Sequence, residues 1–201
     1  AITFGGTVNG ATNLNVSTSA IVNFTFNIGS TTPLTDFDVT AATINMGAGS
    51  IRTDGGTMSF TGAVVLTSGS GLSIYTEDGG NSAAGSVTFT PGSTLSATAA
   101  NRNLTIQTRV GGAGLPGAVT VRDMNASAGF NLNNLTVLAD NYVPGESANV
   151  TLSGPITLTG NLDIDARTVS FSGSTSDVTV LGAGTVNIDA TQNIVFAIGS
   201  S

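Results

Sequence analysis

The sequence has no cysteine, histidine, tryptophan or lysine. Without cysteine there can be no disulfide framework and no thiolate metal site. Without histidine and cysteine, Ser-His-Asp triads, Cys-His pairs and the usual zinc sites are also excluded. A chain without cysteine fits an exported bacterial protein that must cross an oxidising periplasm.

Charged and aromatic residues are scarce, at 8% and 5% of the chain, whereas about a quarter of an ordinary soluble domain is charged. The five basic residues are all arginines scattered singly, and the net charge is −7. This charge repels phosphate backbones, so we do not expect nucleic acid as a partner. No apolar run approaches the ~18 residues of a membrane-spanning helix, so we do not expect membrane insertion either.

Threonine, asparagine and glycine are abundant instead. Among them a triplet of apolar, polar and apolar residues returns at a nearly regular interval along the whole chain. The triplets are Leu14-Asn15-Val16, Ala42-Thr43-Ile44, Leu72-Ser73-Ile74, Leu104-Thr105-Ile106, Leu135-Thr136-Val137, Leu162-Asp163-Ile164 and Val186-Asn187-Ile188. Repeats of this period indicate a solenoid, in which each unit buries its apolar face by stacking on its neighbours.

Two further sets of triplets follow the first. The second comprises Val22-Asn23-Phe24, Met58-Ser59-Phe60, Val87-Thr88-Phe89, Val119-Thr120-Val121, Val150-Thr151-Leu152, Val169-Ser170-Phe171 and Ile194-Val195-Phe196. The third comprises Phe37-Asp38-Val39, Val64-Val65-Leu66, Leu95-Ser96-Ala97, Phe130-Asn131-Leu132, Ile156-Thr157-Leu158 and Val178-Thr179-Val180. Three short alternating strands per repeat predict an all-β fold, a parallel β-helix of about seven three-stranded coils forming a single domain over residues 1–201. An antiparallel sandwich is the competing fold, but it does not require three sets that recur in phase.

The alternation within each triplet predicts which side chains point into the core. We expect one aliphatic column from Ile74, Ile106, Val137 and Ile164. A second column should contain phenylalanines, and its members are Phe60, Phe89, Leu152 and Phe171. The loops at 77–85, 111–117 and 140–147 fall in the same gap of successive repeats, so they should stack on one side, where a ligand would bind if any does.

Segments 6–16, 154–166 and 182–191, which read GTVNGATNLNV, GPITLTGNLDIDA and GAGTVNIDAT, resemble the β-strand repeats of large bacterial surface proteins. Filamentous-haemagglutinin-like and autotransporter-passenger adhesins are rich in such segments. The resemblance covers the whole chain in style and implies a right-handed parallel β-helix, export to the cell surface, and a role as shaft or adhesive fibre. It transfers no catalytic residue.

A few carboxylates remain as candidate ligands or catalysts. Asp165 and Asp189 should face outward one coil apart, about 4.8 Å from each other, and could share a cation or act as a glycosidase-like pair. Glu77 and Asp78 share a loop and, with Asp165 and Asp189, are the weak candidates for a Ca²⁺ site. The calcium-binding nonapeptide of β-helices is absent, and solvated surface carboxylates are the simpler interpretation. We therefore expect no catalytic residues and no cofactor.

The favoured function is a structural or adhesive fibre segment of an extracellular bacterial surface protein, which is not an enzyme. Its partners would be the rest of a longer chain or other copies end to end, and host or neighbouring-cell glycans or proteins. Both ends begin or finish within expected strands, as in a segment of a longer chain or filament. Two alternatives stay open: a polysaccharide-binding or polysaccharide-cleaving β-helix, and an ice-binding solenoid.

Overall fold

The computed structural model describes residues 1–77, 83–109, 114–124, 130–140, 148–173 and 177–196. Among these residues the chain forms sixteen β-strands and no helix. The strands are β1 (Ile2–Phe4), β2 (Asn13–Ser17), β3 (Ile21–Phe24), β4 (Asp36–Met46), β5 (Ser50–Arg52), β6 (Met58–Leu66), β7 (Leu72–Tyr75), β8 (Val87–Phe89), β9 (Thr94–Ala97), β10 (Leu104–Gln107), β11 (Val119–Met124), β12 (Leu135–Leu138), β13 (Asn149–Leu158), β14 (Leu162–Ser172), β15 (Val178–Val180) and β16 (Val186–Phe196). A search of the described residues for a helix able to cross a membrane found none.

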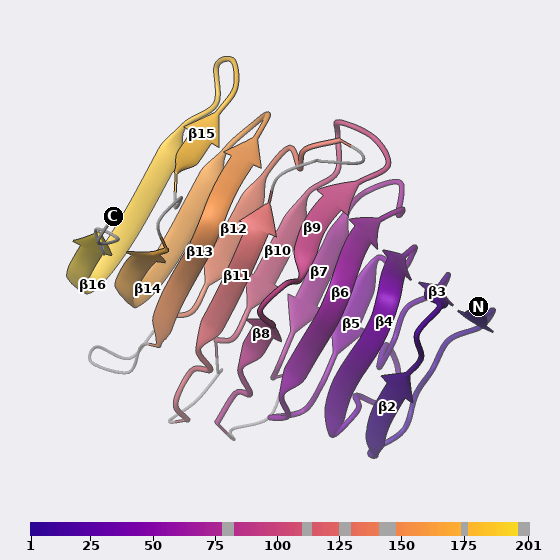
Figure 1. Ribbon diagram of the computed structural model, residues 1–201. Helices are drawn as coiled ribbons and strands as arrows, with labels where there is room; N and C mark the ends of the chain where they lie inside the picture. Colours follow the sequence, from indigo (N-terminus) through magenta and orange to yellow (C-terminus); the bar gives the residue numbers. More distant parts are fainter. Residues whose placement is uncertain (78–82, 110–113, 125–129, 141–147, 174–176, 197–201) are drawn as a thin grey trace.

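Every pairing between these strands is parallel, and all sixteen belong to one hydrogen-bonded sheet. Most strands that are neighbours in the sheet are not neighbours in the sequence, because parallel strands need a long connection between them. The strands lie side by side from the N-terminus to the C-terminus, and the two termini are on opposite sides of the molecule (Figure 1).

The pairs fall into three series, which we call ladders A, B and C. Ladder A runs through β5, β7, β10, β12 and the first halves of β14 and β16. Ladder B runs through β2, the first halves of β4 and β6, β8, β11, the first half of β13 and the second halves of β14 and β16. Ladder C runs through β1, β3, the second halves of β4 and β6, and β9, and reappears as the second half of β13 with β15.

Isolated bridges extend ladders A and C beyond the named strands. In ladder A, Val8 pairs with Ile28 and Ile28 with Ile51, all in parallel. In ladder C, Leu132 pairs in parallel with Leu158, whereas Ala97 pairs with Phe130 in an antiparallel bridge. The regular parallel pairing of ladder C is therefore interrupted between β9 and β13.

Each ladder buries alternate residues in a column. In ladder A, Ile74 pairs with Ile106, Ile106 with Val137 and Val137 with Ile164, and none of the four exposes any surface. The aliphatic column that the sequence predicts is thus confirmed. The predicted second column is confirmed in its pairs, Phe60 with Phe89 and Leu152 with Phe171.

Phenylalanine rings join ladders B and C near the N-terminal side. Phe4 stacks on Phe24 with ring centroids 4.8 Å apart, and Phe60 stacks on Phe89 at 5.0 Å. Phe37 lies between these pairs and makes edge contacts with Phe24 at 5.3 Å and with Phe60 at 5.8 Å. Such contacts contribute about 0.5–1.5 kcal/mol each beyond the burial of area, and they fix how the two ladders pack.

Glycine is required where the connections from ladder A to ladder B run against each other. A Cβ on Gly85 would lie 1.9 Å from the carbonyl oxygen of Gly56, and one on Gly117 would lie 1.9 Å from that of Gly85. The amide of Ala84 donates to the carbonyl of Leu115 at 2.9 Å beside them. The described parts of the 77–85 and 111–117 loops therefore stack as expected, whereas residues 141–147 of the third loop lie outside the described residues.

The predicted strand positions are wrong before about residue 58, and also at Phe130, which is 52% exposed and not inward because it pairs with Ala97 in an antiparallel bridge. Val16 pairs with Val39 in ladder B, and Ile44 pairs with Val22 and Val64 in ladder C, so neither shares a ladder with Ile74. The Val22 triplet likewise belongs to ladder C and the Phe37 triplet to ladder B.

The reason is the spacing of the first repeats. Val8, Ile28 and Ile51 are successive residues of ladder A, and they follow one another more closely than later members of the ladder do, because their connections are short. A set of triplets chosen at a constant spacing therefore moves from one ladder to another in this part of the chain. Ile51 was missed because it is a lone apolar residue in a short segment. Ile28 was missed because the triplet that it ends, Phe26-Asn27-Ile28, runs on directly from the Val22 triplet and was not separated from it.

Ile106→Asp should abolish stable folding, because it places a carboxylate without a counter-charge in the middle of a closed aliphatic column. We expect a loss of about 4 kcal/mol or more in the free energy of unfolding, measured by thermal and denaturant melts. Thr105→Asp, on the adjacent outward position, should change it by less than about 1 kcal/mol. Equal damage by the two substitutions would contradict the strand phase.

Gly85→Ala should destabilise the fold by about 2 kcal/mol or more, because its Cβ cannot fit against the Gly56 carbonyl without moving the backbone. Gly69→Ala is the matched control, since a Cβ there meets no atom within 4 Å. Its melting temperature should match that of the wild type or exceed it, because alanine restricts the unfolded chain. A Gly85→Ala protein as stable as Gly69→Ala would show that the two loops do not stack this closely.

Candidate functional site

The outward face of ladder A carries two rows of side chains. In the first row Ser73, Thr105, Thr136, Asp163 and Asn187 occupy successive paired positions. In the second row the positions are held by Arg52, Tyr75, Gln107, Leu138, Asp165 and Asp189. This face contains most of the chemistry that the sequence analysis singled out, since both aspartates of the proposed pair lie on it.

Asp165 and Asp189 are directly paired positions on β14 and β16, as the spacing predicts. Asp165 also forms an ion pair with Arg109, which follows β10. The arginine therefore reaches past β12 to a strand two positions along the ladder. Sequence reasoning missed this contact because residues 109 and 165 are 56 positions apart and Arg109 stands outside every triplet.

The pKa of the Asp165 carboxyl is raised above its ordinary value of 3.8. Burial of the carboxylate is the largest cause, and the negative charges of Asp140 and Asp189 act in the same direction. The guanidinium of Arg109 opposes them through its charge and its hydrogen bond. Asp165 thus lies near two further carboxylates and is paired with one arginine, which compensates only part of the electrostatic cost.

Asp163 belongs to a different network in the first row. Its Oδ1 accepts a hydrogen bond of 2.8 Å from the side-chain amide of Asn187 on the neighbouring strand. Beside it a hollow of about 320 Å³ is lined by polar groups and one leucine. The lining residues are Asn134, Thr136, Asn161, Leu162, Asp163, Thr185 and Asn187.

Asparagines at the edge of this hollow hold the backbone. Oδ1 of Asn103 accepts from the backbone amide of Asn134 at 3.2 Å, Oδ1 of Asn134 from that of Asn161 at 2.6 Å, and Oδ1 of Asn161 from that of Thr185 at 2.9 Å. Each side chain satisfies a main-chain donor of the next repeat at the corner between ladders C and A. These amides therefore have a structural role that explains their regular spacing.

The remaining acidic candidates do not gather around Asp165. Glu77 is 7% exposed in the segment after β7, and Asp78 lies outside the described residues. Asp36 accepts two bonds from Thr57, at 2.8 Å from the backbone amide and 3.1 Å from the hydroxyl. Among the described residues no group of three or more acidic side chains is arranged to hold a metal ion, and Glu77, Asp78, Asp165 and Asp189 stay the weak candidates for calcium that the sequence offers.

Few of the described aromatic residues are available for binding sugars on this face. The guanidinium of Arg52 lies over the ring of Tyr75, 4.9 Å from its centroid. That contact covers one face of the ring, which is the surface that a sugar would stack on. The other tyrosine, Tyr142, lies outside the described residues.

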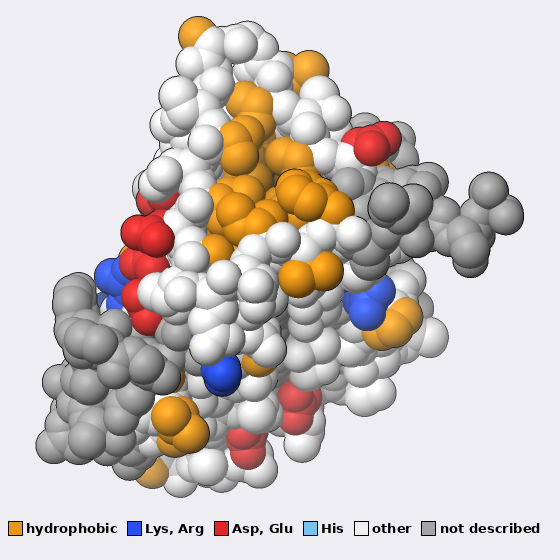
Figure 2. Space-filling model, turned by 90° about the vertical axis from the view of Figure 1, so that its left-hand side faces the viewer, with side chains coloured by type: hydrophobic (Ala, Val, Ile, Leu, Met, Phe, Trp, Pro, Cys, Tyr) orange, Lys and Arg blue, Asp and Glu red, His pale blue; other side chains and the backbone are white. Residues whose placement is uncertain are grey.

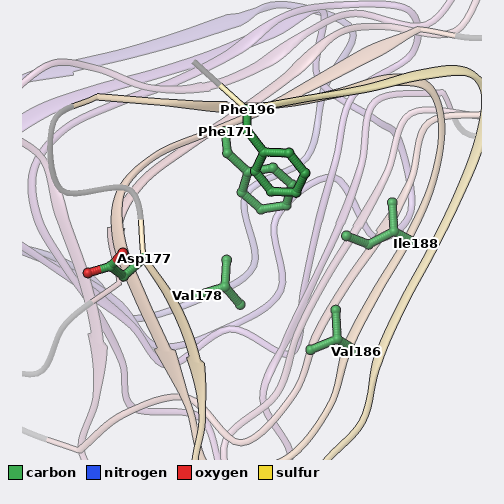
Figure 3. Close-up of a pocket in the computed structure, with 6 residues that line it drawn as sticks. All are labelled: Phe171, Asp177, Val178, Val186, Ile188 and Phe196. Atoms are coloured by element: carbon green, nitrogen blue, oxygen red, sulfur yellow. The ribbon is translucent and has the colours of Figure 1, made fainter. Parts of the chain in front are cut away.

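The end of the molecule at β15 and β16 has a different character. Figure 2, viewed from this end, shows hydrophobic side chains gathered in the middle of the surface. A hollow of about 430 Å³ lies there, lined by Phe171, Asp177, Val178, Val186, Ile188 and Phe196. Figure 3 shows Phe171 and Phe196 stacked on one side of this hollow and the aliphatic side chains around the rest. We call this surface the C-terminal end face.

Comparisons with models of known protein families, with curated proteins and with solved structures found no match to this chain.

The pKa of Asp165 should respond to its neighbours with opposite signs. Arg109→Gln should raise it further, because the favourable charge is removed, whereas Asp189→Asn should lower it. Carboxyl carbon chemical shifts followed by NMR as a function of pH measure both changes. Arg102→Gln is the control, because that guanidinium donates to the Gly69 carbonyl and to Asn101, and the Asp165 pKa should then be unchanged. Identical titrations in all three variants would contradict the cluster.

The same shift determines a pH dependence of stability. Since the folded chain holds the Asp165 proton more tightly than the unfolded chain, the free energy of unfolding should fall as the pH rises from 3.8 through the raised pKa. In Arg109→Gln this fall should be larger, and in Asp165→Asn the contribution should vanish. Denaturant melts across the acidic to neutral pH range compare the three chains, and equal pH dependence in all of them would contradict the assignment.

Proposed function

We propose that this chain is a right-handed parallel β-helix that serves as a structural or adhesive shaft segment of an extracellular bacterial surface protein. Successive passages of the chain contribute to ladders C, A and B in the same order. β9, β10 and β11 are one such passage, and β15 with the two halves of β16 is another. This fixed order is the observation that carries the proposal. Parallel strands joined through crossovers are right-handed in about 98% of cases, which supports the handedness.

The proposed helix has eight turns, one more than the triplets predict. The additional turn arises at the N-terminal side, where Val8, Ile28 and Ile51 each mark a turn in ladder A. Seven intervals of about 4.8 Å give a rod roughly 34 Å long. Apart from the charges gathered on ladder A, its outer faces carry threonine, serine and asparagine, which suits a shaft whose function depends on length and repetition.

The composition and the family resemblance support the cell-surface assignment. The chain has no cysteine, which suits a chain exported into an oxidising compartment, and its 8% of charged residues fits the polar, uncharged style of the repeats that it resembles. Its partners would then be adjoining segments or copies along the axis, and glycans or proteins met at its outer faces. Nothing in this role requires catalysis, so we propose that the chain is not an enzyme.

A polysaccharide-cleaving β-helix is the second candidate, favoured by the cluster of Asp165, Asp189 and Asp140 with Arg109. Paired carboxylates with a raised pKa can act as acid and base on a glycosidic bond. The Arg109 ion pair already occupies Asp165, however, and the neighbouring Leu138 and Gln107 add no further acid or base. The arrangement therefore supports a structural role better than a catalytic one.

The shaft role predicts that the chain acts as a rigid spacer. Placed between a bacterial surface anchor and an epitope tag, it should hold the tag about 30 Å farther from the surface than a short linker does. The displacement can be measured by atomic force microscopy or fluorescence interference. It should be lost in Ile106→Asp and kept in Thr105→Asp. An undisplaced tag on a folded chain would contradict the proposal.

The enzyme alternative has its own test. Incubation with a panel of acidic and neutral polysaccharides should release no new reducing ends or unsaturated sugars above the buffer control. Cleavage that disappears in Asp165→Asn or Asp189→Asn, but persists in Asp163→Asn, would overturn the shaft proposal and establish the carboxylate pair as catalytic.

A further inference from the structure

The side chains at the C-terminal end face belong to the same inward columns as the buried core, but here they are exposed. Val186, Ile194 and Phe196 are 52%, 46% and 70% exposed, whereas Leu162 and Val169, which pair with the first two in the preceding turn, are fully buried. All these side chains are on the inward side of their strands. They are uncovered because β16 pairs only with β14 among the described strands.

The opposite end of the molecule, formed by β1, Val8 and β2, exposes the beginning of these columns. Ile2 is 38% exposed, and Phe4, Val8 and Leu14 are partly buried against the core. No acidic or basic side chain precedes Asp36 in the sequence. We call this surface the N-terminal end face.

Hydrogen bonding gives the two end faces a complementary polarity. Along the ladders, inward residues bond to the following strand: the amide of Ile28 donates to Ser50 at 3.0 Å, and that of Leu162 to Thr185 at 2.9 Å. Outward residues bond to the preceding strand, as Arg52 does to Ile28 at 3.0 Å. By this alternation the inward residues Val186 and Ile188 direct their N–H and C=O groups to the open edge of β16. On the N-terminal end face it is the outward residues beside Val8 that direct their N–H and C=O groups to the open edge.

We propose that the C-terminal end face docks the N-terminal end face of a second copy of this chain, so that each ladder continues across the contact in parallel. This inference rests on the proposed β-helix and names its axial partner. β15 pairs with β1 of the other copy, the first half of β16 with the segment around Val8, and the second half with β2. The unpaired edges at both faces then gain the same main-chain partners that interior strands have.

Side-chain size supports this register. Continuing the columns places Val180 against Phe4 of the other copy and Phe196 against Val16, so a large ring meets a smaller aliphatic side chain in each. Ile188 meets Val8 in ladder A. The ring of Phe4, which already stacks on Phe24 with one face, then has the hollow beside Val178 for its other face.

Charge and polarity disfavour the two symmetric alternatives. Joining two C-terminal end faces would bring Asp177 and Asp189 of one copy close to the same residues of the other, where like charges repel. Joining two N-terminal end faces would set outward-residue edges against each other, a combination that no pair of named strands in the described chain uses. Only the head-to-tail contact repeats the interior pairing, and because it does not close, it propagates into a filament.

Two charged substitutions test the contact, one on each end face. The wild-type chain should associate in a concentration-dependent way in sedimentation velocity experiments, and filaments should appear by negative-stain microscopy. Val186→Asp and Val8→Asp should each weaken self-association at least tenfold, because an unpaired carboxylate would be buried in the contact. Val195→Asp, an outward position on the same strand β16, should associate like the wild type.

Mixing the two blocked chains decides the geometry. Val186→Asp retains an intact N-terminal end face and Val8→Asp an intact C-terminal one, so an equimolar mixture should form one-to-one dimers and nothing longer. Dimers of Val186→Asp alone would indicate a contact between two N-terminal end faces, and dimers of Val8→Asp alone a contact between two C-terminal end faces; either overturns the proposal. So does a wild-type chain that is monomeric at all concentrations.

Far-UV circular dichroism and melts verify that each variant folds. Ile2→Asp and Ile194→Asp provide second blocks on the two end faces should either first variant unfold. A folded, rod-shaped chain that stays monomeric would overturn the docking while leaving the shaft proposal in place. Polysaccharide cleavage dependent on Asp165 would overturn the shaft proposal without bearing on the association measurements.

Discussion

In-register parallel stacking is the constraint on which the rest of this structure depends. The strands are short, and the shortest have only three residues, so none could bury enough apolar surface by itself. When strands from successive passages pair directly, their inward side chains align into columns such as Ile74, Ile106, Val137 and Ile164. Full burial contributes about 1.5–3 kcal/mol per residue, and every interior position obtains it from both neighbours.

The corners between ladders are adapted to the same spacing. Where two connections run in contact, Gly56, Gly85 and Gly117 remove the Cβ that would separate them. Where the chain turns from ladder C to ladder A, asparagine side chains bond the backbone of the next passage. Both devices satisfy polar backbone without charge, which explains how a chain with 8% charged residues can hold sixteen strands in register.

Several of the few charges are gathered on the outer face of ladder A. Burial and the charges of Asp140 and Asp189 raise the pKa of Asp165, and Arg109, which follows a strand two positions along the ladder, offsets part of that shift. Such an ion pair is partly exposed and contributes little to stability by itself. Its significance here is that stacking brings together acidic residues that are far apart in the chain, which would also be the simplest route for a β-helix to acquire a binding or catalytic site.

Local alternation in the sequence determined which residues face inward, because a period of two can be read from a few residues. Between Met58 and Phe171 the exception is Phe130, which is 52% exposed. The all-β class and the pairing of Asp165 with Asp189 followed from this alternation.

The ladder to which each early triplet belongs was decided only by the tertiary structure, since short connections before residue 58 shift the phase in a way that spacing alone cannot show. The Arg109–Asp165 ion pair and the stacked glycines were likewise beyond the sequence, because they depend on which passages of the chain meet in space. Alternation is a property of neighbouring residues, whereas register is a property of strands that meet only after the chain has closed a full repeat.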